Sequence, residues 1–156
     1  MLIVYSPTDG DVERFDARSL RVSETTIAAR TDGRTWPEIR DGLREDLEAM
    51  RVVAWVIKKR SHPSLRYGDF DPGVEELQTR LDRDEVKRWA QATAEVAWMD
   101  AEATPVSVAA AMRIIPTVAD DREHAERVVA ELAAERPKDA ALPPKQSSDR
   151  SETPAS

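Results

Sequence analysis

The sequence predicts a mainly α fold: a helical domain with a small N-terminal β-hairpin and a disordered C-terminal tail. Three observations support this prediction. Apolar residues recur at helical spacing between residues 43 and 57, a β-prone run precedes an Asp-Gly dipeptide near the N-terminus, and residues 137–156 are rich in proline and serine. We expect one compact domain, with the hairpin over 1–21 and the helical part over 22–136, followed by the tail.

Composition limits the classes of function that fit the chain. Of its 156 residues, 40% are hydrophobic and 34% are charged, so the core must be thin and built on helical stripes. The net charge of -7 argues against binding a nucleic acid backbone, and the absence of cysteine excludes thiolate zinc sites and cysteine nucleophiles. No run approaches the roughly 20 apolar residues of a membrane span, and the N-terminus lacks a signal peptide pattern. We therefore expect a soluble, cytosolic protein that binds neither nucleic acid nor membranes.

The first elements follow from turn and capping residues. Leu2 to Tyr5 and Val12 to Phe15 are expected to form the hairpin, with Asp9-Gly10 in its turn. Ser23 is a plausible N-cap for a short helix over 24–30, which Gly33 ends. Thr35 then caps a second helix that begins with Trp36-Pro37 and a carboxylate in its first turn.

The strongest periodic signal predicts a helix over 43–60. Leu43, Leu47, Met50, Val53 or Ala54, and Ile57 lie three and four residues apart, and the basic residues 58–60 suit a helix C-terminus. Pro63 forbids continuation of this helix. The segment 62–73 is predicted to be an ordered but irregular loop, pinned to the core by Leu65, Tyr67 and Phe70.

The second half of the chain is expected to be helical. Helical spacing resumes over 74–81, and a longer helix begins at Asp82. Residues 104–107 are predicted to be a turn or linker, and Pro116 interrupts the apolar run over 106–115. Asp120 or Asp121 caps a final helix that runs to about residue 135.

Few residues suggest chemistry. His62, Asp69 and Asp71 could hold a metal or act as a base and its orienting group, but polar loop residues that satisfy the backbone explain them more simply. No phosphate-binding glycine loop, nucleophile elbow or zinc-helix motif is present. We therefore expect no catalytic, cofactor-binding or metal-binding residues. The four tryptophans fall on or beside apolar stripes, where they either pack in the core or contact a partner: Trp36, Trp55, Trp89 and Trp98.

Four segments carry a resemblance to a known family: LIVYSPTDGDVERFD, TWPEIRDGL, MRVVAWVIKKR and SHPSLRYGDFD. In this order they resemble the tail assembly chaperones of long-tailed, siphovirus-type actinobacterial phages and prophages. The resemblance covers about residues 1–90, and its most distinctive part is the tryptophan-bearing helix with the loop that follows.

The resemblance implies a non-enzymatic protein, without metal or cofactor, that binds the tape measure protein and helps to recruit tail tube protein. It implies a place in the host cytoplasm rather than in the mature virion, possible self-association, and a longer form made by a ribosomal frameshift in the tail. The alternative is a head-to-tail connector or another small morphogenesis protein that stays in the virion. We expect partner contacts on the helix 43–60 and the following loop, at Trp55, Leu65, Arg66, Tyr67 and Phe70.

Overall fold

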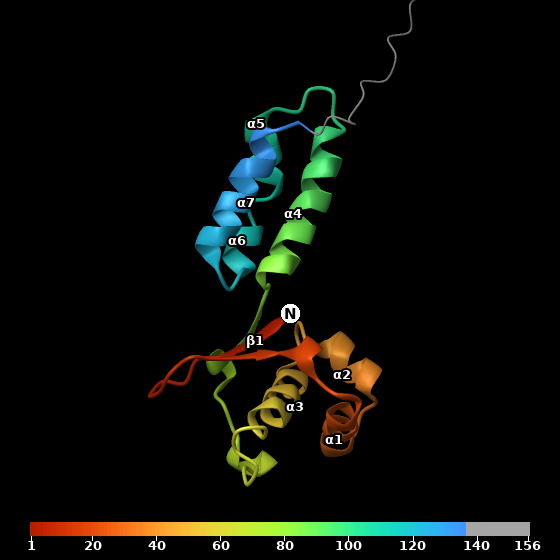
Figure 1. Ribbon diagram of the computed structural model, residues 1–156, viewed down its shortest axis with the longest axis vertical. Coiled ribbons are helices and arrows are strands. Elements are labelled where there is room, and N and C mark those ends of the chain that lie inside the picture. Colours follow the sequence, from red (N-terminus) through yellow and green to blue (C-terminus); the bar gives the residue numbers. More distant parts are fainter. Residues whose placement is uncertain (137–156) are drawn as a thin grey trace, which may run out of the picture.

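The computed structural model describes residues 1–136, which form two lobes (Figure 1). The N-terminal lobe contains β1 (Leu2–Tyr5), β2 (Glu13–Asp16), α1 (Val22–Asp32), α2 (Trp36–Gly42), α3 (Leu47–Lys58) and β3 (Leu77–Arg80). The C-terminal lobe contains α4 (Arg83–Trp98), α5 (Pro105–Ala111), α6 (Ile115–Val118) and α7 (Arg122–Ala134). Single turns of 3-10 helix occur at Ala17–Ser19, Tyr67–Asp69 and Val74–Glu76. The predicted mainly helical fold with a small N-terminal sheet is confirmed.

The sheet has three antiparallel strands in the order β2-β1-β3. The predicted hairpin is confirmed, with Ile3 opposite Phe15, and both side chains are buried. The predicted helix over 74–81 is wrong, because residues 77–80 pair with the second edge of β1 and place Leu77 in the core. Eight residues with a glycine just before them gain little as an isolated helix, whereas an open strand edge supplies a complete row of backbone partners.

Three helices lie together on one side of the sheet (Figure 1). The buried stripe predicted for α3 is confirmed, but this helix begins at Leu47 and not at Leu43. Leu43 instead ends α2, and the Asp46 side chain accepts hydrogen bonds from the N–H groups of Glu48 and Ala49, which starts a new helix. Helix α3 packs against α1, α2, β2 and β3, so it is the centre of the N-terminal core.

The C-terminal lobe has a separate core between α4, α5, α6 and α7. The Trp98 ring is buried in it, and its Nε1 donates a hydrogen bond to the Leu132 carbonyl at 3.1 Å. The predicted helix start at Asp82 is confirmed, with Asp82 as the N-cap of α4, and of the two caps predicted for the last helix, Asp120 or Asp121, the structure uses Asp121. The predicted linker over 104–107 is wrong, because the Thr104 and Ser107 hydroxyls complete a cap that begins α5.

The two lobes meet at a short connection. The Leu81 N–H donates to the Val118 carbonyl at 2.9 Å, and the Asp120 N–H donates to the Leu81 carbonyl at 3.0 Å. Arg14 on β2 forms an ion pair with Asp120 at 2.9 Å. The helical part predicted over 22–136 thus contributes to two hydrophobic cores rather than one. The predicted disordered tail, 137–156, lies outside the described residues.

Within residues 1–136, no helix combines the length and the apolar character needed to cross a lipid bilayer.

Candidate partner-binding surfaces

The loop after α3 folds back along that helix and is held by Arg51. The Arg51 Nε donates to the Phe70 carbonyl at 2.8 Å, and its Nη2 donates to the Tyr67 carbonyl at 3.2 Å. The guanidinium also lies 4.3 Å from the centre of the Tyr67 ring, within the range of a cation–π contact. One turn further along α3, the Trp55 Nε1 donates to the Leu65 carbonyl at 3.2 Å. The prediction of an ordered, irregular loop pinned to the core is confirmed.

The five residues predicted to contact a partner differ in exposure. Trp55 and Phe70 are only 6% and 4% exposed, Leu65 and Tyr67 are half-buried, and Arg66 is exposed. The Trp55 ring meets the Tyr67 ring edge-on at 5.2 Å, and Phe70 meets Tyr5 at 5.4 Å. Trp55 and Phe70 therefore lie in the N-terminal core and anchor the loop to it. Of these five side chains, those of Arg66 and parts of Leu65 and Tyr67 are therefore accessible at the surface.

The Tyr67 hydroxyl donates a hydrogen bond to the Glu48 carboxylate. Burial of the ring, together with this hydrogen bond, raises the pKa of Tyr67 above its ordinary value. The phenol therefore stays protonated and acts as a donor that fixes the loop to the first turn of α3.

The residues considered for catalysis or metal binding are not brought together. His62 Nδ1 lies 2.9 Å from the Ser61 hydroxyl, and Asp71 lies 3.7 Å from the Arg51 guanidinium. In the part of the chain that the structure describes, no group of three or more histidine, aspartate and glutamate side chains could hold a metal ion.

An open apolar groove lies between α1, α2 and the first turn of α4, with a volume of about 580 Å³. Sequence reasoning did not identify it, because its residues come from five separate segments. Apolar side chains form most of its lining: Met1, Ala17, Leu20, Val22, Trp36 and Leu43. Arg18, Thr25, Arg40 and Glu85 complete it. We call this surface the α1–α2 groove.

The wall of the α1–α2 groove depends on a reversal between two helices. Gly33 ends α1 with a φ of 88°, a left-handed conformation that glycine adopts without strain. Thr35 then begins α2 with a capping box to Glu38, so Trp36 in the first turn turns back toward α1. Val22, at the start of α1, is 84% exposed at the opposite rim.

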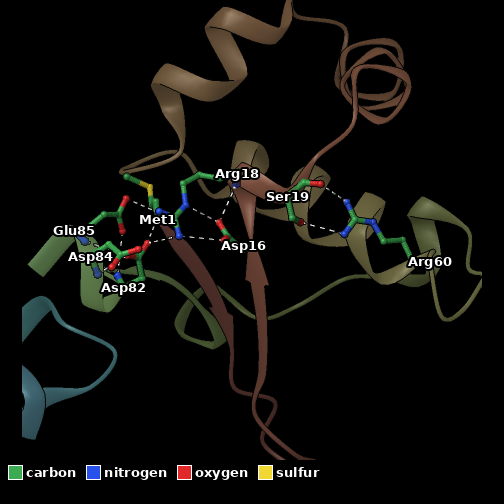
Figure 2. Close-up of polar contacts among 8 residues, drawn as sticks. All are labelled: Met1, Asp16, Arg18, Ser19, Arg60, Asp82, Asp84 and Glu85. Carbon is green, nitrogen blue, oxygen red and sulfur yellow. Dashed lines mark hydrogen bonds and ion pairs between the residues drawn. The ribbon is translucent and has the colours of Figure 1, made fainter.

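A cluster of charges borders the α1–α2 groove at the junction of the lobes (Figure 2). Arg18 donates to Asp16 at 3.1 Å and forms an ion pair with Asp82 at 2.9 Å. The Met1 amino group also lies 3.1 Å from Asp82. Burial raises the pKa of Asp82, but hydrogen bonds from the Glu85 backbone N–H and the Met1 amino group outweigh it and hold this pKa below its ordinary value. Asp82 is therefore charged while it caps α4 and binds the N-terminal lobe.

A second arginine, Arg60, fixes the segment between β2 and α1 that lines the α1–α2 groove. Arg60, just after α3, donates to the Ser19 carbonyl at 2.8 Å and to the Ser19 hydroxyl at 3.1 Å (Figure 2). It also forms an ion pair with Glu24 in the first turn of α1 at 2.7 Å. These contacts fix the segment that carries Leu20 into the α1–α2 groove.

Comparison with protein-family models, curated proteins and solved structures found no match. The fold and these surfaces define a two-lobed, mainly helical protein with a pinned loop on α3 and an open apolar groove at the lobe junction.

Proposed function

We propose that this protein is a phage tail assembly chaperone that binds an amphipathic helical segment of the tape measure protein in the α1–α2 groove. The observation that carries the proposal is the groove itself, an open surface lined mainly by apolar side chains. The four segments that resemble the chaperone family form the hairpin, α2, α3 and the pinned loop, all in the N-terminal lobe that builds most of the groove.

The chemistry of the α1–α2 groove suits a helical ligand. An amphipathic helix places apolar anchors three and four residues apart, and a groove of about 580 Å³ accepts a few of them. A tape measure protein is a long helical chain whose apolar faces promote aggregation before the tail tube surrounds it. Covering such faces keeps the chain soluble in the host cytoplasm, and this role requires no catalysis or cofactor.

The test is co-expression of the neighbouring tape measure protein with this chain, followed by co-purification. The wild type is expected to raise the soluble yield of the tape measure protein and to form a complex with it. Val22→Glu is expected to weaken binding about tenfold or more, because the loss of one apolar anchor and the burial of a carboxylate each cost more than 1 kcal/mol. Val22 is 84% exposed, so its replacement leaves the core intact.

The matched control is Val106→Glu, the same change at a residue that is 79% exposed in the C-terminal lobe. This variant is expected to bind like the wild type. Equal binding by both variants would refute the α1–α2 groove as the site, and no rescue by the wild type would refute the chaperone role.

Purified virions separate this proposal from a head-to-tail connector. A chaperone leaves the particle once the tube has assembled, so mass spectrometry of virions is expected to find the tube protein without this chain. Stoichiometric retention of this chain would identify a connector instead.

A further inference from the structure

The two lobes do not share a hydrophobic core. Within residues 1–136 their cores have no residue in common, and the pairs of elements that pack most closely each lie within one lobe. An open cleft of about 490 Å³ lies between the lobes. Its lining comes from both of them, with Leu81 at the connection: Met1, Arg44, Thr79 and Arg80 from the N-terminal lobe, and Trp89 and Val118 from the C-terminal lobe. An incompletely packed junction of this kind permits relative motion of two domains unless polar contacts fix their angle.

Two ion pairs between side chains join the lobes within the described residues. Arg14 on β2 places its Nε 2.9 Å from both carboxylate oxygens of Asp120. Arg18 lies 2.9 Å from Asp82 (Figure 2). We call these two contacts the junction ion pairs. The Arg14 and Arg18 side chains are 49% and 48% exposed, so dissolved salt screens both pairs.

The chain passes from one lobe to the other at the link between Arg80 and Leu81. Arg80 ends β3 and pairs with β1, so it moves with the N-terminal lobe. The Leu81 N–H and carbonyl are both bonded to backbone groups of residues 118 and 120, and its side chain packs against the C-terminal core. The Arg80 Nη1 donates to the Thr117 carbonyl at 2.7 Å, a single hydrogen bond that tethers the lobes beside the link. Rotation of the lobes is therefore confined to the backbone dihedral angles at this link.

The angle between the lobes also affects the α1–α2 groove. Of the residues within 1–136 that line this groove, Glu85 alone comes from the C-terminal lobe. It lies in the first turn of α4, near Asp82, and forms an ion pair with the Met1 amino group of the N-terminal lobe (Figure 2). Rotation of the C-terminal lobe away from Arg18 withdraws Glu85 and widens the groove at that end.

We propose that the junction ion pairs hold the lobes at one angle, and that the C-terminal lobe rotates about the Arg80–Leu81 link when these pairs are released. The arrangement is sensitive to ionic strength, because the Debye length falls from about 30 Å at about 10 mM salt to about 3 Å at about 1 M. The effect of the rotation on a ligand of the α1–α2 groove rests on the proposed function. The rotation itself does not, and it is measured without a ligand, so the two proposals can fail separately.

The test is single-molecule energy transfer between dyes on the two lobes. The chain has no cysteine, so Ser64→Cys and Ala101→Cys supply two attachment sites at exposed residues. The loop after α3 carries the first site and the turn after α4 the second, and these segments lie at opposite ends of the molecule (Figure 1). A rotation between the lobes therefore changes the distance between the dyes. We expect one narrow distribution of transfer efficiency at about 10 mM salt and a shifted or broader one at about 1 M.

A charge exchange assigns the effect to one of the junction ion pairs. Arg14→Glu and Asp120→Arg each place like charges opposite one another, and each is expected to raise the ratio of rotated to unrotated molecules about tenfold at low salt. The double variant restores opposite charges and is expected to return to the wild-type distribution. Asp120 suits this exchange because Asp121 is the residue that caps α7. Arg30→Glu is the matched control, since Arg30 is exposed and forms no ion pair within the described residues.

Circular dichroism of each variant distinguishes rotation from unfolding. The helical signal is expected to stay constant while the transfer efficiency changes. The proposal is overturned by the same efficiency distribution at both salt concentrations, by single reversals that behave like the control, or by a double variant that does not recover. A loss of helical signal together with the change in efficiency also overturns it, because the lobes then unfold rather than rotate.

Discussion

Replacement of Arg51 by methionine tests whether this side chain holds the loop after α3. The change keeps an unbranched apolar stem of similar length and removes the guanidinium. It therefore deletes the hydrogen bonds to the Phe70 and Tyr67 carbonyls and the cation–π contact with the Tyr67 ring. The two carbonyls lose their charged donor, while the core beneath the loop keeps its volume.

The expected loss in the free energy of unfolding is about 2–4 kcal/mol. Each hydrogen bond from a charged donor contributes about 1.5–3 kcal/mol, and the cation–π contact adds about 0.5–1 kcal/mol. The Arg51 side chain is 21% exposed, so water compensates for part of the loss and the sum of these contributions is an upper bound. The weak contacts of Arg51 with Glu48 at 3.5 Å and Asp71 at 3.7 Å add little.

The assay is urea denaturation followed by tryptophan fluorescence, with hydrogen exchange of the 65–70 amides as a local readout. Arg66→Met is the matched control, because Arg66 lies in the same loop, is exposed, and its side chain forms no hydrogen bond within the described residues. We expect faster exchange in Arg51→Met and unchanged exchange in the control. A free energy of unfolding within about 0.5 kcal/mol of the control would refute the assigned role of Arg51.

Two further predictions concern backbone strain and pH. Gly33→Ala is expected to cost about 1–2 kcal/mol, because alanine at a φ of 88° is strained although no atom lies within 4 Å of the added Cβ. Thermal unfolding would measure this cost against Gly68→Ala, which also has open space and has no positive φ. The hydrogen bond from Arg60 lowers the pKa of Glu24 to about 2, so its contribution to stability is complete above pH 4.5 and is lost as the pH falls toward 2. Glu24→Gln should therefore flatten the acid side of a stability–pH profile, and an unchanged profile would contradict this linkage.

Local signals in the sequence were sufficient to predict a helix where a capping residue and an apolar periodicity indicate the same element. Thr35, Asp82 and the α3 stripe predicted helices that the structure contains. The strand at residues 77–80 could not be predicted in the same way, because its pairing partner, β1, lies more than 70 residues away in the sequence. Leu77 and Leu81 have helical spacing, and only the open edge of β1 favours a strand there.

The tryptophans show why the candidate site was harder to predict than the fold. Trp55 and Trp98 are buried, whereas Trp89 is 42% exposed, yet all three lie on helical apolar patterns of similar quality. Periodicity reports that a face is apolar, and does not report whether the same chain or another one covers it. The two separate cores, and the groove at their junction, arise from contacts between distant segments. No local sequence pattern therefore predicts them.

The central position of β1 has a consequence for synthesis on the ribosome. The N-terminal strand can complete its sheet only after residues 77–80 have left the exit tunnel, since β3 supplies its second neighbour. From that point the first 81 residues can fold as a unit while α4 to α7 are still being translated. The later helices contact one another within about 50 residues, so their assembly is local and fast. A pause in translation shortly after β3 emerges would therefore leave a folded N-terminal lobe waiting for the rest of the chain.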